Sequence, residues 1–243
     1  MTAQEMRDEF LILYDKITNF DAPGYTDEEI SRLLTKAQER IVLTKINPLS
    51  NKYRTGFERT EKLRKDLSEL VKTAELTSSD LSSNQEGVLT NGQFYDLPSD
   101  FLFAVGEYAI ITHPDSCYNG TEVIIKPVVT DEYNVNRINP FKKPYQKVIW
   151  RLDVSKDIPS GSFRHELIGD GVLGINRYKL RYIKYPSPII SDTSTIDGVT
   201  GPQNSELNRI LHRQIIDEAV KLASGITDPE TYQIKSITKD GAE

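Results

Sequence analysis

The three histidines and the one cysteine of this 243-residue chain are the side chains whose types most often carry out chemistry. His113 and Cys117 have the spacing of half a zinc site, but a structural zinc ion needs three or four ligands and no others lie near them in the sequence. His212 falls in a predicted helix beside Arg213, and His165 falls in a predicted strand. We therefore interpret these residues as structural and expect no metal site.

Catalytic motifs are missing from the sequence. It has no nucleophile elbow, no phosphate-binding loop and no dinucleotide-binding glycine pattern. The glycine-rich segment 169–174 lies between two predicted strands, where it is typical of a hairpin turn. The carboxylates Asp27, Glu28 and Glu29 stand at a predicted helix start, where they favour the helix dipole. We therefore expect no enzyme and no cofactor.

Basic and aromatic side chains alternate between residues 177 and 185. The basic ones are Arg177, Lys179, Arg181 and Lys184, and the tyrosines are Tyr178, Tyr182 and Tyr185. Such a run could stack on bases and contact phosphates. A half-buried strand with its basic side chains in water gives the same alternation. The sequence pI of about 5.3 argues against general affinity for DNA.

The net charge of −6 is unevenly distributed. Residues 1–30 contain eight acidic and two basic residues, whereas residues 137–184 contain eleven basic and four acidic residues. These runs are ordinary solvated faces in one interpretation. In the other, the acidic end of one copy meets the basic middle of a neighbouring copy, because complementary potentials set register in assemblies.

Composition narrows the class of protein further. A single cysteine excludes an internal disulfide framework and fits a reducing compartment. No apolar run approaches the roughly 20 residues that a membrane helix needs. The first ten residues are acidic, which is not typical of a signal peptide. We therefore expect a protein that is synthesised in the cytoplasm and does not enter a membrane.

Four amphipathic helices are predicted, over residues 2–19, 26–47, 55–75 and 204–224. In the second, Thr26 and Glu29 have the spacing of a capping box. Its apolar residues follow the spacing of one buried helix face: Ile30, Leu33, Leu34, Ala37 and Ile41. Thr55 and Glu58 predict a similar start for the third helix, whose buried side is Leu63, Leu67, Leu70 and Val71. Gly225 is expected to end the last helix.

Short strands separated by turn-forming residues are predicted over 92–96, 103–112, 122–128, 147–154, 163–168 and 177–185. Residues 130–137 predict a short helix, and residues 139–145 a basic loop that leaves the sheet. In the tail, Tyr232, Ile234 and Ile237 alternate like a strand that could add to another chain's sheet. A frayed terminus explains the same tail equally well.

These elements predict an α+β fold. Three N-terminal helices and the C-terminal helix, residues 1–75 and 203–226, form a helical bundle because their apolar faces need one another. Residues 76–202 form an inserted antiparallel β barrel or sandwich. Residues 227–243 form a C-terminal tail.

Four short motifs resemble a known family. They read I-x-x-L-L-x-x-A-Q at residues 30–38, Y-x-L-P-x-D-F at 95–101, Y-x-x-x-P-x-P at 182–188 and L-x-x-x-I-x-x-x-A in the last helix. Across residues 26–225 the chain resembles the head-to-tail adaptor, or neck ring, proteins of short-tailed phages, and most of all the ring proteins of crAss-like phages.

The resemblance implies a virion structural protein at the head–tail junction. About twelve copies would form a ring that connects the portal to other neck and tail proteins, around a channel for genomic DNA that is not recognised by sequence. The family has no catalytic residues to carry over. The candidate interface residues are Arg137, Lys142, Lys143, Arg177, Lys179, Arg181, Lys184, Tyr232, Ile234 and Ile237. The alternatives are a DNA-binding protein that uses the basic surface of residues 177–184, and a hydrolase with an unrecognised site.

Overall fold

The chain divides into two compact units in a computed structural model, which describes residues 1–15, 24–47, 49, 59–78, 89, 91–145, 147–155 and 163–227. The helical unit is Met1–Leu70 with Tyr185–Glu243, and the β unit is Val71–Lys184. From the sequence, the boundaries between the helical unit and the β unit were expected at 75/76 and 202/203. The difference places residues 185–202 with the helices.

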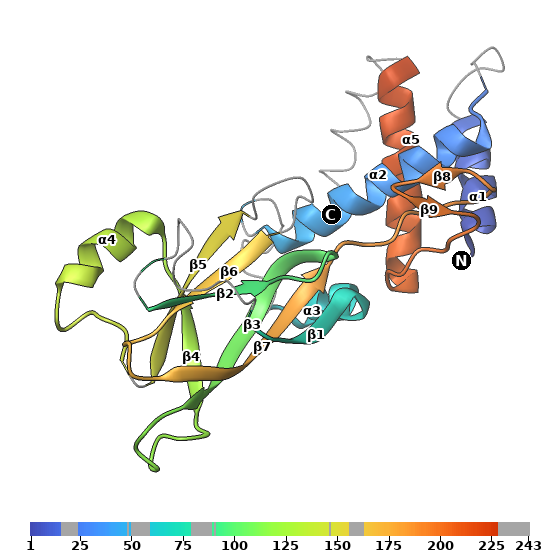
Figure 1. Ribbon diagram of the computed structural model, residues 1–243. Helices are drawn as coiled ribbons and strands as arrows, with labels where there is room; N and C mark the ends of the chain where they lie inside the picture. The colour runs from blue at the N-terminus through green and yellow to red at the C-terminus, as the bar shows by residue number, and fades with distance from the viewer. Residues whose placement is uncertain are drawn as a thin grey trace. The chain divides into compact units, whose positions relative to one another are not determined.

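The helical unit is built on three helices that pack against one another, α1 (Ala3–Asp15), α2 (Asp27–Ile46) and α5 (Arg209–Thr227), as Figure 1 shows. The capping box that starts α2 is confirmed, because Glu29 N donates to Thr26 Oγ1 at 3.4 Å and Thr26 N donates to Glu29 Oε2 at 2.8 Å. Helix α5 begins later than expected, at Arg209, where the Asn208 side chain accepts from Ile210 N.

Apolar side chains of the three helices fill the space between them. Of the predicted stripe on α2, all but Ile41 are buried, and its neighbour Val42 is buried instead. Tyr25 packs edge-on against Tyr14 and donates from its hydroxyl to the carbonyl of Ala223. The prediction that Gly225 ends the last helix is wrong, because α5 continues to Thr227.

Polar residues on the buried face of α2 hold the segment that follows the β unit. Gln38 donates from Nε2 to the carbonyl of Ser187 at 2.8 Å and accepts from the Ser205 hydroxyl at 2.6 Å. Ile189 N donates to Thr35 Oγ1 at 3.0 Å. This segment also contains a short hairpin, β8 (Thr195–Ile196) and β9 (Val199–Thr200). The hydrogen bonds explain why residues 185–202 belong to the helical unit.

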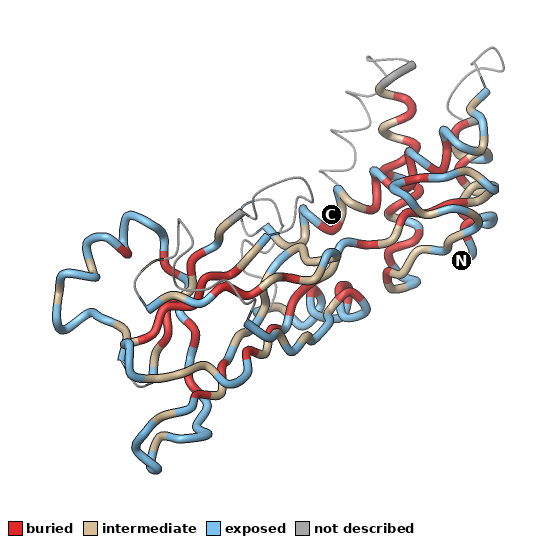
Figure 2. Tube along the Cα trace, viewed as in Figure 1, coloured by how far each residue is buried: buried red, intermediate tan, exposed pale blue. Residues whose placement is uncertain are grey.

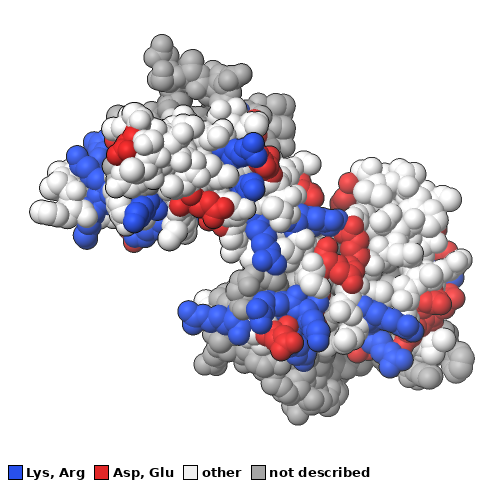
Figure 3. All heavy atoms as spheres, turned by 90° about the horizontal axis from the view of Figure 1, so that it is seen from below, with Lys and Arg blue, Asp and Glu red and all other residues white. Residues whose placement is uncertain are grey.

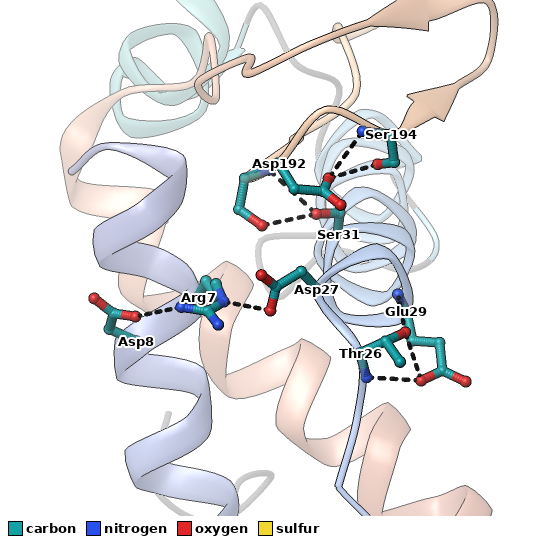
Figure 4. A network of polar contacts seen from close by, with 9 residues as sticks. Arg7, Asp8, Thr26, Asp27, Glu29, Ser31, Asp192 and Ser194 are labelled. Atoms are coloured by element: carbon teal, nitrogen blue, oxygen red, sulfur yellow. Dashed lines mark hydrogen bonds and ion pairs between the residues drawn. The ribbon is translucent and has the colours of Figure 1, made fainter.

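Further polar contacts fix the start of α2 (Figure 4). Arg7 of α1 donates from Nε to Asp27 at 2.7 Å and also pairs with Asp8. Ser31 bonds the hydroxyl of Ser191 at 3.1 Å. The three segments of the unit are therefore cross-linked by polar side chains as well as by apolar packing.

The third helix differs from its prediction. Its expected start at Thr55 and Glu58 lies outside the described residues. Helix α3 (Glu61–Leu67) and a 3₁₀ turn, η2 (Ser68–Leu70), are followed at once by strand β1 (Val71–Leu76). The assignment of Val71 to a helix is wrong, because β1 pairs along its whole length with another strand and this tertiary pairing overrides local preference. Lys45 of α2 pairs with Asp66 of α3 at 2.7 Å.

The β unit is one curled seven-stranded sheet in the order β1-β7-β3-β4-β5-β6-β2. Its other strands are β2 (Gly92–Asp96), β3 (Phe101–Thr112), β4 (Glu122–Pro127), β5 (Val148–Ser155), β6 (Phe163–Ile168) and β7 (Gly174–Lys184). The sheet forms a half-barrel, and an isolated bridge between Ser78 and Tyr95 joins its two ends at one point. The α+β fold class is confirmed.

The sheet is mixed rather than wholly antiparallel. Strands β4 and β5 pair in parallel, whereas the other neighbours in this sheet are antiparallel. Neighbouring parallel strands need a crossover between them. Helix α4 (Thr130–Ile138) and the loop 139–145 supply it. The prediction of an antiparallel sheet is therefore wrong at this pair.

Buried residues are frequent along the strands of the sheet (Figure 2), and each face carries an apolar cluster. We define the inner face by its larger cluster, which contains Tyr95, Leu97, Ala109, Ile111, Val123, Ile125, Ile149, Leu167, Tyr178, Leu180 and Tyr182. The opposite, outer face carries a smaller cluster of Val128, Tyr133, Trp150, Leu152 and Ile168. Tyr133 brings α4 onto this outer cluster through an edge-on contact with Trp150.

Candidate assembly surfaces

Strand β7 separates its basic and apolar side chains as the sequence predicted. Tyr178, Leu180 and Tyr182 are buried on the inner face. Because successive side chains of a strand point to opposite faces, Arg177, Lys179 and Arg181 lie on the outer face. We call these three residues the basic strand surface. Arg177 and Arg181 are exposed, whereas Lys179 and, at the end of β7, Lys184 are half-buried.

Side chains of the neighbouring strands balance the positive charge of the basic strand surface only weakly. Arg177 Nε lies 3.5 Å from Glu75 Oε1 of β1, and Lys179 Nζ lies 5.6 Å from the centre of the Tyr108 ring of β3. Arg181 forms no ion pair within the part of the chain that the structure describes. Exposed pairs of this kind contribute about 0–1 kcal/mol each. The positive charge of this surface therefore remains available to a partner.

The tyrosines of β7 cannot stack on bases. Tyr178 and Tyr182 are buried, and the Tyr182 hydroxyl donates to Asp100 at 2.9 Å. Burial, with this hydrogen bond, raises the pKa of Tyr182 to about 12. Of the three tyrosines considered for stacking, only Tyr185 is exposed. Tyr178 and Tyr182 are therefore unavailable for stacking on bases, which leaves Tyr185 alone of the three in a position to stack.

A second basic group lies around α4. Arg137 lies at the end of the helix, with its guanidinium 6.0 Å from the centre of the Tyr133 ring, and Lys142 and Lys143 are exposed in the following loop. The Asn139 side chain accepts from the backbone N–H of Phe141 at 3.0 Å and so turns the chain out of the helix. We call α4 and residues 139–145 together the α4 surface. It borders a groove of about 710 Å³.

The structure keeps the two basic groups apart. Strands β3 and β4 lie between β7 and β5, which is about 14 Å of sheet at the usual strand spacing. Figure 3 shows Lys and Arg side chains interrupted by Asp and Glu on one side of the molecule. The remaining candidates, Tyr232, Ile234 and Ile237, lie outside the described residues. The basic candidate residues therefore form two separate groups, one on β7 and one around α4.

A polar network at the inner face, buried except for the exposed side chain of Asp153, was not predicted from the sequence. Arg151 of β5 pairs with Glu107 of β3 and lies 3.2 Å from Asp153. His165 of β6 approaches Asp153 with Nε2 at 3.3 Å and the Tyr178 hydroxyl with Nδ1 at 2.6 Å. The alternation of β5 and β6 was the signal for it, since that pattern turns Arg151, Asp153 and His165 inward together with Ile149 and Leu167.

Burial sets the protonation of this network. It lowers the pKa of His165 to about 3, and the nearby Arg151 charge adds to the effect. His165 is therefore neutral at pH 7, and its Nε2 carries the proton because the Asp153 carboxylate can only accept. Nδ1 then accepts from the Tyr178 hydroxyl, whose pKa burial raises. Burial also raises the pKa of Glu107, and Arg151 opposes that rise.

The other chemistry-bearing residues stay separate. His113 and Cys117 lie in the turn after β3, where Asp115 N donates to His113 Nδ1 at 3.0 Å and Cys117 is exposed. His212 bonds the carbonyl of Leu207 at 2.9 Å. Among the described residues, no group of three or more His, Cys, Asp or Glu side chains could hold a metal ion. No described helix has both the length and the apolar character needed to cross a membrane.

Comparison with known proteins decides the family. Residues 1–233 match the family described as phage tail ring protein 3/4. The chain belongs to this family. The match extends over both the helical unit and the β unit, so it covers the whole described architecture.

Two relatives come from one phage. The chain is 35% identical over 232 residues to ring protein 4/5 of Bacteroides phage crAss001, a match that covers 92% of each chain. It is 31% identical over 228 residues to ring protein 3 of the same phage, covering 92% of this chain and 95% of the relative. The resemblance to ring proteins of crAss-like phages is therefore confirmed.

Proposed function

We propose that this chain is a structural ring subunit of a phage virion, placed at the head–tail junction between the portal and the tail. The observation that carries the proposal is the match of residues 1–233 to the phage tail ring protein family. It is supported by two relatives of nearly equal length that are named as ring proteins.

A ring requires a heterologous interface, in which two different surfaces of one subunit meet on successive copies. The basic strand surface and the α4 surface are candidates for such contacts, since the described residues leave most of the charge on both surfaces unpaired. The tail residues Tyr232, Ile234 and Ile237 remain a third candidate. About twelve copies, each using the same pair of surfaces, would close the ring.

The chain's charge is consistent with a channel that DNA passes through without being held. Its net charge of −6 repels the DNA backbone overall. The buried Tyr178 and Tyr182 offer no stacking platform. We propose that genomic DNA passes the ring with neither sequence recognition nor strong adhesion.

Reversing the charge of the basic strand surface tests its part in assembly. The triple variant Arg177→Glu, Lys179→Glu, Arg181→Glu should lose most of its ring yield in negative-stain images while keeping its unfolding midpoint, because these exposed pairs contribute about 0–1 kcal/mol each.

A matched control changes the net charge by the same amount elsewhere. The variant Lys62→Glu, Arg64→Glu, Lys65→Glu alters three exposed residues of α3. It should retain the wild-type ring yield. Equal ring yield from the two triple variants would count against the basic strand surface as an interface.

The second candidate function is DNA binding through the same basic surface. DNA binding is favoured by Arg181, whose charge forms no ion pair within the described part of the chain. Retention of DNA by the purified chain, falling steeply as salt rises, would support it over the structural role. We expect weak retention that the Lys62, Arg64 and Lys65 control reduces as much as the basic strand variant does.

A further inference from the structure

The α4 surface exposes more large apolar side chains than a solvated helix and loop need. Of the nine residues of α4, only Tyr133 is buried. Val135 is 70%, Ile138 is 76% and Phe141 is 96% exposed. Figure 2 shows α4 and its loop as almost wholly exposed or intermediate. Contiguous exposed apolar side chains of this kind mark interaction sites.

Charge is ordered along the same surface. Asp131 and Glu132 stand at the start of α4, and the cations Arg137, Lys142 and Lys143 follow at its end and in the loop. The groove beside them is lined by both groups and by Phe141 and Tyr145. A partner for this surface must therefore offer apolar side chains with carboxylates on one side and cations on the other.

The helical unit presents such a face on α1 and α5. Glu5, Asp8, Glu9 and Ile12 follow the spacing of one face of α1, and α5 adds Arg209, Ile210 and Arg213 beside them around a groove of about 790 Å³. Ile12 is 55% and Ile210 is 70% exposed. The Met1 amino group lies 3.1 Å from His212 Nδ1, which fixes α1 beside α5. We call this set the α1–α5 face.

We propose that the α4 surface of one copy docks on the α1–α5 face of the next copy in the ring, with Phe141 against Ile12 and Ile210. The proposal rests on the proposed ring function. Lys142 and Lys143 then meet carboxylates of α1, while Asp131 and Glu132 meet Arg209 and Arg213. Complementary charge of this kind fixes register, and a central aromatic residue supplies most of the binding energy.

A second copy is the partner that these two surfaces favour, because each chain carries both halves of the contact. The two surfaces are different, so the contact is heterologous, and repeated use of it generates rings or filaments. A self-paired α4 surface would bring Asp131 and Glu132 of one copy to Lys142 and Lys143 of the other, but such an isologous contact closes a dimer and cannot continue into a ring.

Cross-linking tests the contact directly. In a Cys117→Ser background, the double variant Lys143→Cys, Glu5→Cys, which keeps Phe141, Ile12 and Ile210, is treated with a short bismaleimide after ring assembly. We expect a ladder of covalent multimers on a denaturing gel, and no ladder from either single variant. Assembled rings that yield no ladder, or a cross-link confined to single chains, would overturn the proposal.

A charge swap supplies an independent readout. Lys142→Glu with Lys143→Glu, and separately Asp8→Lys with Glu9→Lys, should each lower ring yield at least tenfold. Combining all four should restore it, because the substituted residues then again meet opposite charges. If the wild type forms rings but the combined variant does not regain its ring yield, the docking proposal is wrong and the proposed ring function still stands. A wild-type chain that forms no ring even with its neck partners would overturn the ring function as well.

A matched pair of valines separates docking from folding. Val135→Asp places a charge on the α4 surface, and Val172→Asp places one on an exposed turn of the same unit, where the valine is 59% exposed. Both variants should unfold like the wild type. Only Val135→Asp should lose rings, and equal ring yield from the two would refute the assignment of this surface.

Discussion

Removing Arg151 should destabilise the β unit strongly. The side chains of Arg151 and Glu107 are 11% and 7% exposed, and Glu107 Oε2 is buried without a hydrogen-bond partner in the described part of the chain. Arg151→Met keeps the length of the side chain but leaves the Glu107 carboxylate buried and unpaired. Loss of one partner from a buried pair costs about 3–5 kcal/mol, which is a large part of the roughly 5–15 kcal/mol that stabilises a domain.

The loss of stability caused by Arg151→Met should grow as pH rises. Burial raises the pKa of Glu107, and Arg151 opposes that rise. A carboxyl whose folded pKa is raised stabilises the fold below its unfolded pKa, and this stability is lost as pH rises through the folded pKa. In Arg151→Met the opposing charge is gone, so the folded pKa of Glu107 rises further. The variant should therefore lie closer to the wild type at pH 5 than at pH 8.

The assay is urea unfolding followed by tryptophan fluorescence. Trp150 is the one tryptophan of the chain and lies buried beside Arg151, so its emission reports on the β unit. The double variant Glu107→Leu, Arg151→Met should recover most of the lost stability, because apolar replacement of a buried pair is often neutral or stabilising. Arg137→Met, an exposed arginine, is the control and should cost less than about 1 kcal/mol.

Two results would refute this reasoning. One is an Arg151→Met variant within about 1 kcal/mol of the wild type at pH 8, which would mean that the pair is not desolvated. The other is a double variant as unstable as the single one, which would mean that Arg151 acts through packing or through Asp153 rather than through Glu107.

Two further changes test the helical unit. Thr26→Ala removes the two hydrogen bonds of the Thr26 hydroxyl, one from Glu29 N and one to Glu29 Oε2, and leaves the bond from the backbone N–H of residue 26. It should lower the free energy of unfolding by about 1 kcal/mol, measured by far-ultraviolet circular dichroism in urea; no change would mean that the cap is not formed in solution. Gln38→Leu leaves the Ser187 carbonyl and the Ser205 hydroxyl without their partner and should cost about 1–3 kcal/mol, with faster amide exchange in residues 187–191; unaltered exchange would argue that α2 does not hold this segment.

The sequence predicted the elements that depend on local signals. The capping box, the amphipathic faces of α2 and α5 and the alternation of β7 are each readable from neighbouring residues, and the structure confirms them. Residues 71–76 could not be assigned in the same way, because their pairing partner, β7, lies a hundred residues later. The parallel pairing of β4 and β5 likewise follows from a crossover that periodicity does not show.

The same distinction between local signals and the order of strands in the sheet applies to the candidate surfaces. Alternation alone placed Arg177, Lys179 and Arg181 on the face of the sheet opposite Tyr178, Leu180 and Tyr182. It could not show that β3 and β4 separate them from Lys142 and Lys143, since strand order is a property of the whole sheet. The buried network around Arg151 was missed because charged residues in a strand are usually exposed, and only its neighbours in space make burial tolerable.

Electron cryomicroscopy of the intact virion, without imposed symmetry, is the measurement that bears most directly on the ring. We predict density for about twelve copies of this chain closed around the channel between portal and tail, with each copy touching the next through two different surfaces. Particles that carry the chain at another site, in an open arrangement, or in contact only through identical surfaces would contradict the account.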